Sequence, residues 1–509
     1  MSESKESGPG MVYLVGAGPG DLGLITVKGR ECLEKADVVI YDYLSNSRML
    51  EWTRPEAELI YVGKKSKAHT LPQGGINELL VERARAGKTV CRLKGGDPMI
   101  FGRGGEEGAE LYAAGIPFEI VPGISSAIAG PMYAGIPVTH RDHCSQLTIF
   151  TGHEDPTKME SSINFRNLAQ ADGTKVMLMG VERMRGITDS LLKEGMKPET
   201  PVALVRWATT GRQETLTGTL ADIAEKVEIT GFQAPAVAVF GDVVGRREQL
   251  NWFESKPLFG KRIVVTRTRK QAGALSKQLA DLGAEVYELP TIRIDPPKDM
   301  MGFGELVMDA HAYDWLIFTS PNGAEAFFEL FYKIYEDARS IGGVKIAAIG
   351  PGTASTIKEY RIGVDLVPKK SVAEGLVEAL VEEIGDLSSL RMLWVRAEET
   401  RDVLQVALTK LGVILDDAIA YRTVPETTDR TGAVERFRTE GADVITFTSS
   451  STVEHFLDLR IPLPEGLKIA SIGPITSQTI EDHGLQVDIE ASEFDIPGLV
   501  KAVVELCGR

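Results

Sequence analysis

Short apolar runs alternate with amphipathic segments along the first quarter of the chain. The apolar runs predict strands and the amphipathic segments predict helices. The strands are expected over 11–15, 37–41, 89–93 and 118–121, and the helices over 25–36, 76–86 and 105–114. Because strands and helices alternate, we expect a mostly parallel sheet, which binds ligands beyond the carboxyl ends of its strands.

From about residue 146 the pattern changes. Apolar runs still predict strands, but fewer clear helices separate them. These strands are expected over 147–151, 175–180, 202–207 and 236–241. We therefore expect a first domain over 11–250, with a parallel α/β subdomain (11–143) and a mixed α/β subdomain (144–250). Residues 251–260 look like a linker.

Beyond this linker the chain repeats itself. D-W-L-I-F-T-S at 314–320 is echoed by D-V-I-T-F-T-S at 443–449, and the segment at 345–357 is echoed at 468–480. Each copy is a strand followed by a helix, and the copies lie ~125 residues apart, too far for a solenoid. The repeat predicts two duplicated parallel α/β lobes. A cleft between such lobes is a natural place for a large ligand.

Length and charge exclude several classes of protein. A chain of 509 residues is too long for one hydrophobic core. Its formal charge of −16 argues against nucleic acid as the main partner. No apolar run reaches the ~18 residues of a membrane span, and no secretory signal is visible at the N-terminus. We expect a cytoplasmic protein with no membrane partner.

Metal-dependent and thiol chemistry are also not expected. The four cysteines are scattered and form no CxxC pair, so free thiols in a reducing compartment are favoured. The seven histidines are not clustered, and we expect no metal site. The chain contains no Ser/His/Asp triad, no phosphate-binding P-loop and no carboxylate pair typical of glycosidases.

The loop V-G-A-G-P-G-D at 15–21 nearly matches the dinucleotide-binding fingerprint G-x-G-x-x-G. Asp21 stands in place of the third glycine, where its carboxylate would repel a pyrophosphate, and Pro19 removes one backbone donor. The loop is therefore either a structural turn or a site for a ligand other than a pyrophosphate. Gly95-Gly96-Asp97-Pro98 allows the same two interpretations. Their position at the ends of strands of one sheet favours a ligand site.

Two charged residues near these loops are equally open. Asp42 lies where a Rossmann fold places its ribose-binding acid, but it could also be a helix N-cap or a turn residue. Lys64 could be a solvated loop charge. Neither residue assigns a function by itself.

Hydroxyl groups gather at the predicted strand ends of the duplicated lobes. They could cap helices, or they could face one cleft and bind carboxylates together with nearby arginines. The candidate substrate-binding residues in this half are Arg267, Thr319, Ser320, Thr353, Arg396, Arg401, Ser449 and Thr476.

A set of motifs in the first half is highly specific. It comprises V-G-A-G-P-G-D, Y-D at 41–42, V-G-K at 62–64, R-L-K-G-G-D-P at 92–98, F-G-R-G at 101–104, V-P-G-I-S at 121–125, G-I-P-V-T-H-R at 135–141 and T-G-H at 151–153. Residues 11–250 thereby closely resemble the uroporphyrinogen-III C-methyltransferase family. The shorter signals V-T-R at 265–267, F-T-S at 318–320, I-G-P at 349–351 and 472–474, and A-Y-R-T at 420–423 are similar to uroporphyrinogen-III synthase over 261–509.

The first resemblance implies a methylase that uses S-adenosyl-L-methionine. This cofactor carries a positively charged sulfonium and no phosphate, which fits a loop that contains the carboxylate of Asp21. It implies that Asp42 is the base and Lys64 the proton donor, and that the enzyme is a homodimer formed through 11–250. The implied cofactor-binding residues are Pro19, Gly95, Gly96, Asp97, Ile100, Ser125, Ser126, Met179 and Ala208. Charge and nearby motifs make Arg92, Lys94, Arg103 and Arg141 candidates for binding substrate carboxylates.

The second resemblance implies closure of linear hydroxymethylbilane with inversion of one pyrrole ring, assisted by Tyr421. It also implies that the chain leaves lobe one, builds lobe two and returns. Lobe one would comprise 261–290 and 425–509, and lobe two 296–417. The crossing strands would be 289–294 and 418–424.

The whole chain is therefore expected to be a bifunctional α/β enzyme of tetrapyrrole synthesis. A methylase fold of two subdomains would be followed by two lobes joined by a two-stranded connection. The product would be precorrin-2, methylated at C2 and C7, for sirohaem or cobalamin synthesis. Two alternatives remain: a methylase of this fold acting on another substrate beside a degenerate synthase half, or a methylase joined to a non-catalytic ligand-binding sensor.

Overall fold

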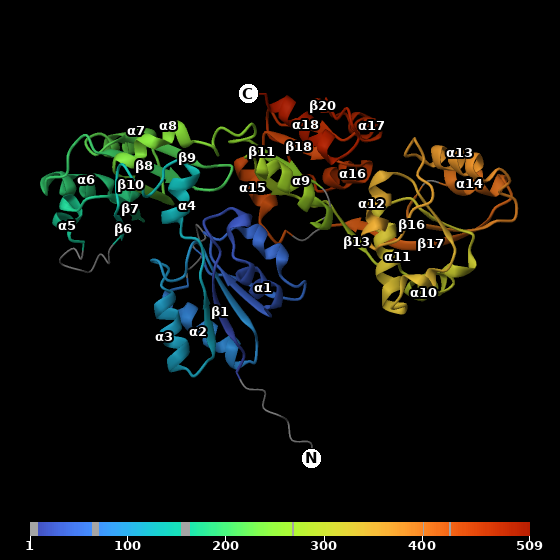
Figure 1. Ribbon diagram of the computed structural model, residues 1–509, viewed down its shortest axis with the longest axis horizontal. Helices are drawn as coiled ribbons and strands as arrows, with labels where there is room; N and C mark the ends of the chain where they lie inside the picture. The colour runs from blue at the N-terminus through green and yellow to red at the C-terminus, as the bar shows by residue number, and fades with distance from the viewer. Residues whose placement is uncertain are drawn as a thin grey trace, which may run out of the picture. The chain divides into compact units, whose positions relative to one another are not determined.

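The computed structural model describes residues 9–63, 71–153, 163–266, 269–400, 402–426 and 429–508. The chain forms two compact units, and each is described separately. Unit one comprises residues 1–289 and 428–509, and unit two comprises residues 290–427. Unit one contains three five-stranded sheets and unit two contains one (Figure 1).

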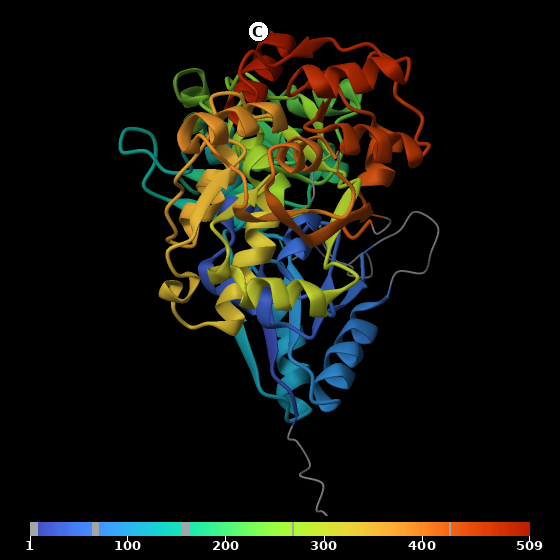
Figure 2. The same ribbon diagram turned by 90° about the vertical axis from the view of Figure 1, so that its right-hand side faces the viewer.

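The first sheet of unit one is parallel throughout, in the order β3-β2-β4-β1-β5. Its strands are β1 (Val12–Gly16), β2 (Val38–Tyr41), β3 (Glu58–Tyr61), β4 (Val90–Lys94) and β5 (Phe118–Val121). Its helices are α1 (Val27–Lys35), α2 (Gln73–Arg85), α3 (Gly104–Ala113) and α4 (Ser126–Tyr133). Figure 2 shows this sheet in blue, with α2 in lighter blue beside it. The predicted parallel α/β pattern is confirmed; the sequence missed β3, an edge strand without a continuous buried run.

The second sheet is mixed, as predicted, in the order β6-β7-β10-β8-β9. Only its β6–β7 pair is parallel among the described strand pairs. The strands are β6 (Leu147–Thr151), β7 (Thr174–Leu178), β8 (Pro201–Arg206), β9 (Glu214–Thr219) and β10 (Ala236–Phe240). Helices α5 (Phe165–Gln170), α6 (Met184–Lys193), α7 (Ile223–Thr230) and α8 (Arg247–Leu250) accompany it. The sequence did not resolve these helices because they are short, with 6, 10, 8 and 4 residues, so each shows few turns of the helical pattern.

The third sheet is parallel and is built from two distant stretches of chain, in the order β12-β11-β18-β19-β20. Its strands are β11 (Arg262–Val265), β12 (Glu285–Glu288), β18 (Val444–Phe447), β19 (Lys468–Ser471) and β20 (Ile489–Glu490). Its helices are α9 (Arg269–Asp281), α15 (Ala433–Glu440), α16 (Ser450–Asp458), α17 (Pro474–Asp482) and α18 (Ile496–Cys507). Buried Thr266 and Thr446 bind backbone carbonyls across β11 and β18 (2.8 and 2.9 Å), which ties the two stretches together.

Unit two has the sheet order β13-β17-β16-β14-β15. Its strands are β13 (Ile292–Asp295), β14 (Trp315–Phe318), β15 (Lys345–Ala348), β16 (Arg391–Ala397) and β17 (Ile414–Pro425). Its helices are α10 (Met300–Met308), α11 (Pro321–Ile334), α12 (Pro351–Glu359), α13 (Ala373–Ile384) and α14 (Val403–Lys410). Phe327, Phe328 and Phe331 of α11 are fully buried in its core.

The internal repeat corresponds to equivalent elements in the two units. The copies at 314–320 and 443–449 form β14 and β18, and those at 345–357 and 468–480 form β15–α12 and β19–α17. The two crossing strands differ in extent from the expectation. β13 begins only at Ile292, and β17 is longer than 418–424; the two pair antiparallel, from Ile292↔Pro425 to Asp295↔Arg422.

Two further absences hold for the described residues. Within them no helix combines the length and the apolar character needed to cross a membrane. All four cysteines lie in this part of the chain as free thiols, and its residues include no cluster suited to a metal ion.

Candidate functional site

A cavity of about 1030 Å³ lies in unit one, lined from both the first and the second sheet. Loops that follow β1, β2 and β4 form one wall, at the carboxyl ends of parallel strands, where such sheets bind ligands. The residues expected at this site that line the cavity are Pro19, Asp42, Arg92, Lys94, Gly95, Gly96, Ile100, Arg103, Ser126, Met179 and Ala208.

Glycines let the loops that follow β1, β4 and β5 touch backbone to backbone. Gly18 and Gly96 exchange two hydrogen bonds (N···O 3.1 and 2.7 Å), and both have positive φ, +75° and +70°. A Cβ on Gly123 would lie 2.2 Å from the Gly96 carbonyl oxygen, and one on Gly16 would lie 2.5 Å from Gly123 Cα. Side chains at Gly16 and Gly123 would therefore force the loops apart.

Three polar residues singled out in the sequence stabilise these loops and do not line the cavity. Asp97 accepts hydrogen bonds from the amides of Gly123 (2.9 Å) and Met99 (2.8 Å). Ser125 is the N-cap of α4. Asp21 accepts from the Gly23 amide and the Tyr133 hydroxyl (2.7 and 2.8 Å), so its carboxylate is held by the protein.

Four charged side chains form one network at the edge of the cavity. Arg92 donates to Asp42 Oδ2 and to Glu107 Oε1, both at 3.2 Å. Lys94 Nζ donates to the same Glu107 oxygen at 2.8 Å. Burial lowers the pKa of Lys94, Arg92 lowers it further, and Glu107 opposes this by raising it. Glu107 was not among the residues expected at the site, because nothing in the sequence distinguishes it from Glu106 and Glu110 of the same helix.

Strained backbone gathers around the same cavity. Eight non-glycine residues in the described part of the chain have positive φ. Four of them line the cavity: Phe101, Arg103, Met179 and Trp207. Such conformations cost about 1–3 kcal/mol each and cluster at ligand sites. This signal for a functional site is visible only in the structure.

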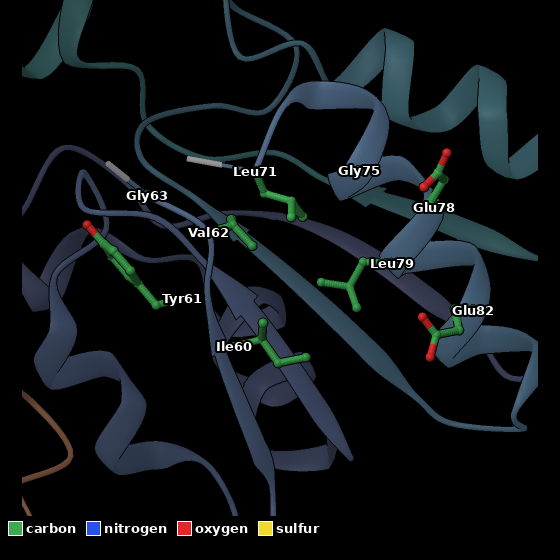
Figure 3. Close-up of a pocket in the computed structure, with 9 residues that line it drawn as sticks. All are labelled: Ile60, Tyr61, Val62, Gly63, Leu71, Gly75, Glu78, Leu79 and Glu82. Carbon is green, nitrogen blue, oxygen red and sulfur yellow. The ribbon is translucent and has the colours of Figure 1, made fainter. Parts of the chain in front are cut away.

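The remaining first-half candidates lie elsewhere. Arg141 is exposed, in a turn next to His140, and does not line the cavity. Lys64 lies outside the described residues. A smaller cavity of about 380 Å³ lies between β3 and α2, where Ile60, Val62, Leu71 and Leu79 face one another (Figure 3).

In unit two, three expected residues lie close together: Thr319 and Ser320 directly after β14, and Tyr421 within β17. The Tyr421 hydroxyl of β17 donates to Ser320 Oγ (3.0 Å), and Ser320 also caps α11. Thr319 Oγ1 accepts from Trp394 Nε1 (3.0 Å). Burial raises the pKa of Tyr421, so the phenol stays neutral and can donate a hydrogen bond.

The other second-half candidates make mainly structural contacts. Arg396 pairs with Asp417 (2.9 Å). Ser449 caps α16, and Thr353 and Thr476 are buried in α12 and α17. Helix capping is thus observed for Ser320 and Ser449. Arg267 and Arg401 lie outside the described residues.

The fold and the cavity define a tetrapyrrole methylase joined to a two-lobed uroporphyrinogen-III synthase. The family described as "Tetrapyrrole (Corrin/Porphyrin) Methylases" matches residues 11–224, and "Uroporphyrinogen-III synthase HemD" matches residues 273–501. The chain belongs to both families, as a fusion of the two enzymes.

Relatives cover the whole chain and its first half. The "Porphyrin biosynthesis protein HemD" of Ruminiclostridium josui is 36% identical over 98% of each chain. The "S-adenosyl-L-methionine-dependent uroporphyrinogen III methyltransferase" of Methanosarcina barkeri is 52% identical over 46% of this chain and 92% of its own. The solved structure of the Uroporphyrin-III C-methyl transferase from Thermus thermophilus, complexed with S-adenyl homocysteine, is 40% identical, covers 46% of this chain and 99% of its own, and has a TM-score of 0.41.

Proposed function

We propose that this protein catalyses two consecutive steps, from hydroxymethylbilane through uroporphyrinogen III to precorrin-2. The second half closes the linear tetrapyrrole with inversion of ring D, and the first half methylates the product at C2 and C7. The observation that carries the proposal is the combination, in one chain, of a glycine-walled cavity in the methylase half with a second half that matches the synthase family over residues 273–501. The product would supply sirohaem or cobalamin synthesis.

The cavity suits S-adenosyl-L-methionine, which supplies an activated methyl group on a positively charged sulfur. Gly95 and Gly96 would offer backbone without side chains to the ligand, next to Pro19, and Met179 and Ala208 line the cavity from the loops after β7 and β8. With Asp21 and Asp97 holding loops, the wall offers backbone groups rather than a cradle for phosphate. Gly95, Ile100, Ser125 and Ser126 complete the proposed cofactor site, either by lining the cavity or, for Ser125, by capping α4.

Asp42 is the proposed base for methyl transfer. It lines the cavity and is held by Arg92 through one oxygen and by the Leu44 amide (3.2 Å) through the other. A fixed carboxylate can remove the proton from the methylated pyrrole carbon. Lys64 is proposed as the proton donor, and Arg103 and Arg141 as cations that bind substrate carboxylates.

The synthase half needs few acid or base groups, because the substrate loses its own hydroxyl before ring closure. Tyr421 is proposed to donate a hydrogen bond to that leaving hydroxyl. Arg267, Arg396 and Arg401 supply charge for the carboxylates, and the hydroxyls of Thr319, Ser320, Thr353, Ser449 and Thr476 supply further polar groups. We also propose that the enzyme is a cytoplasmic homodimer formed through its methylase half, which sedimentation of the full chain would test.

Turnover of hydroxymethylbilane tests both activities together. The protein is incubated with and without S-adenosyl-L-methionine, and the oxidised porphyrin isomers are separated. The type III isomer is expected without the methyl donor, and dimethylated product with it. Type I isomer alone would refute the synthase activity. Unmethylated type III product in the presence of the donor would refute the methylase activity.

The Tyr421→Phe variant is expected to slow ring closure about tenfold, which corresponds to the loss of roughly one hydrogen bond to the leaving group. Methylation of supplied uroporphyrinogen III should not change. The two rates are measured separately on the same preparation. An unchanged rate of ring closure would rule out that Tyr421 assists the departure of the hydroxyl.

A further inference from the structure

Glu107 is a buried carboxylate beside the methylase cavity. It sits in the first turn of α3 and is completely inaccessible to solvent. Its Oε1 accepts from Lys94 Nζ (2.8 Å), Arg92 Nε (3.2 Å) and Gln73 Nε2 (3.3 Å). A buried ion is costly unless it is well paired, and here its pairing partners are two cations that line the cavity.

Arg92 directs its hydrogen bonds into the protein. Its side chain is 4% exposed. Its bonds go to Glu107, to Asp42 and to the carbonyls of Ile40 (3.3 Å) and Leu93 (3.1 Å). These account for four of the five N–H groups of a guanidinium. Arg92 is therefore placed to orient Asp42, and only one of its N–H groups is left to bind a substrate.

Lys94 is almost as buried as Arg92, with 6% of its side chain exposed, but it has fewer hydrogen-bond partners. Its hydrogen bond to Glu107 takes one of the three N–H groups of an ammonium, and the side chain lines the cavity. The charged groups that act on Lys94 are Arg92, Glu107 and Asp42. Lys94 in turn lowers the pKa of Glu106, at the exposed start of α3. Burial and Arg92 favour the neutral amine, whereas Glu107 and Asp42 favour the ammonium.

We propose that Glu107 is a positioning residue that keeps Lys94 charged and aimed into the cavity, where Lys94, rather than Arg92, binds a carboxylate of the tetrapyrrole substrate. This rests on the proposed methylase function. The substrate carries many carboxylates. A charge-assisted hydrogen bond from the buried Lys94 ammonium would hold one of them, and so would position the reacting pyrrole carbon next to Asp42. Glu107 itself does not touch the substrate.

The test is the pH dependence of the Glu107→Gln variant, which keeps the shape of the side chain but removes its charge. The alkaline limb of kcat/KM for uroporphyrinogen III should move to lower pH by about one unit or more, since an ion partner at this distance shifts a pKa by roughly 1–3 units. On that limb KM should rise about tenfold while kcat changes less. Glu107→Asp, which keeps the charge, should leave the limb near its original pH.

Glu110→Gln is the matched control, because Glu110 is an exposed glutamate of the same helix. It should leave both KM and the limb unchanged. Lys94→Gln should show the raised KM at every pH, without the alkaline limb. An unmoved limb in Glu107→Gln, or a fall in kcat at constant KM, would overturn the proposal.

A binding experiment separates this proposal from the proposed function. The affinity of each variant for uroporphyrin III, the stable oxidised analogue, is measured by tryptophan fluorescence across the same pH range, with S-adenosyl-L-homocysteine present. Weaker alkaline binding in Glu107→Gln would support the role of Lys94 even if the parent chain transferred no methyl group. Equal binding of uroporphyrin III by the parent chain and by Glu107→Gln at every pH would refute this role of Lys94, whatever the methylation rate.

Discussion

The Asp42→Asn variant should lose methyl transfer by about 10²–10⁴-fold and close the tetrapyrrole ring at the normal rate, because a general base contributes rate enhancement of this order. Asparagine has the same shape and can still accept a hydrogen bond from the Leu44 amide. It cannot accept the proton released after methylation. Initial rates of both reactions are measured on the same purified protein.

The affinity for S-adenosyl-L-homocysteine is the control for Asp42→Asn. It should stay within a few-fold of the parent value, because the proposed cofactor contacts come from the glycine loops and from Met179 and Ala208. Retention of more than half of the methylation rate would rule out Asp42 as the base. A parallel loss of cofactor affinity would mean that Asp42 supports the cavity instead.

The Gly123→Ala variant should lower the affinity for the cofactor at least about 100-fold. Its Cβ would lie 2.2 Å from the Gly96 carbonyl oxygen and 2.7 Å from Gly16 Cα. These are backbone atoms that cannot move without opening the cavity wall, and a misplacement of about 1 Å is enough to cost two orders of magnitude in activity. Calorimetry with S-adenosyl-L-homocysteine measures the loss, and ring closure by the same protein reports on the rest of the fold.

Two further alanine variants make the Gly123→Ala result interpretable. Gly186 of α6 is exposed, with open space around its Cβ position, so Gly186→Ala should bind normally and gain about 0.5–1 kcal/mol of stability. At Gly96 the nearest atom to an added Cβ is 3.8 Å away, so Gly96→Ala creates no clash between the loops, but the φ of +70° strains an alanine there by about 1–2 kcal/mol. It should still weaken cofactor binding, because the methyl group would occupy the surface next to the ligand. Normal binding by both Gly123→Ala and Gly96→Ala would place the cofactor elsewhere.

The near-fingerprint at 15–21 illustrates what a motif alone can and cannot establish. Its departure from the dinucleotide pattern predicts a loop that does not bind phosphate, because Asp21 and Pro19 change the local chemistry at fixed positions, and the structure shows a tight turn there with Gly18 at positive φ. The sequence did not predict that the Asp21 carboxylate accepts a hydrogen bond from the hydroxyl of Tyr133, more than a hundred residues later in the chain. The partner of a carboxylate depends on which distant segment packs against it.

Arg92 and Lys94 also have roles that depend on contacts with distant segments. The sequence treats both as cations next to a glycine loop, and so predicts the same role for each. Both bind Glu107 of α3, but only Arg92 also binds Asp42 and the carbonyls of Ile40 and Leu93, and no sequence motif records these contacts. The two residues also share one strand, where alternate side chains face the same side of the sheet, so the sequence pattern alone favours treating them alike.

The sequence by itself determined the architecture of this protein: strand–helix alternation, the change to a mixed sheet, the repeat in the second half and the motifs of both families. These features depend on hydrophobic periodicity and on residues close together in the chain. The tertiary structure alone decided which candidate residues share the methylase cavity, which ones hold loops, and that Glu107 lies behind Lys94. Such assignments depend on contacts between distant segments, which form only when the sheets and helices pack together.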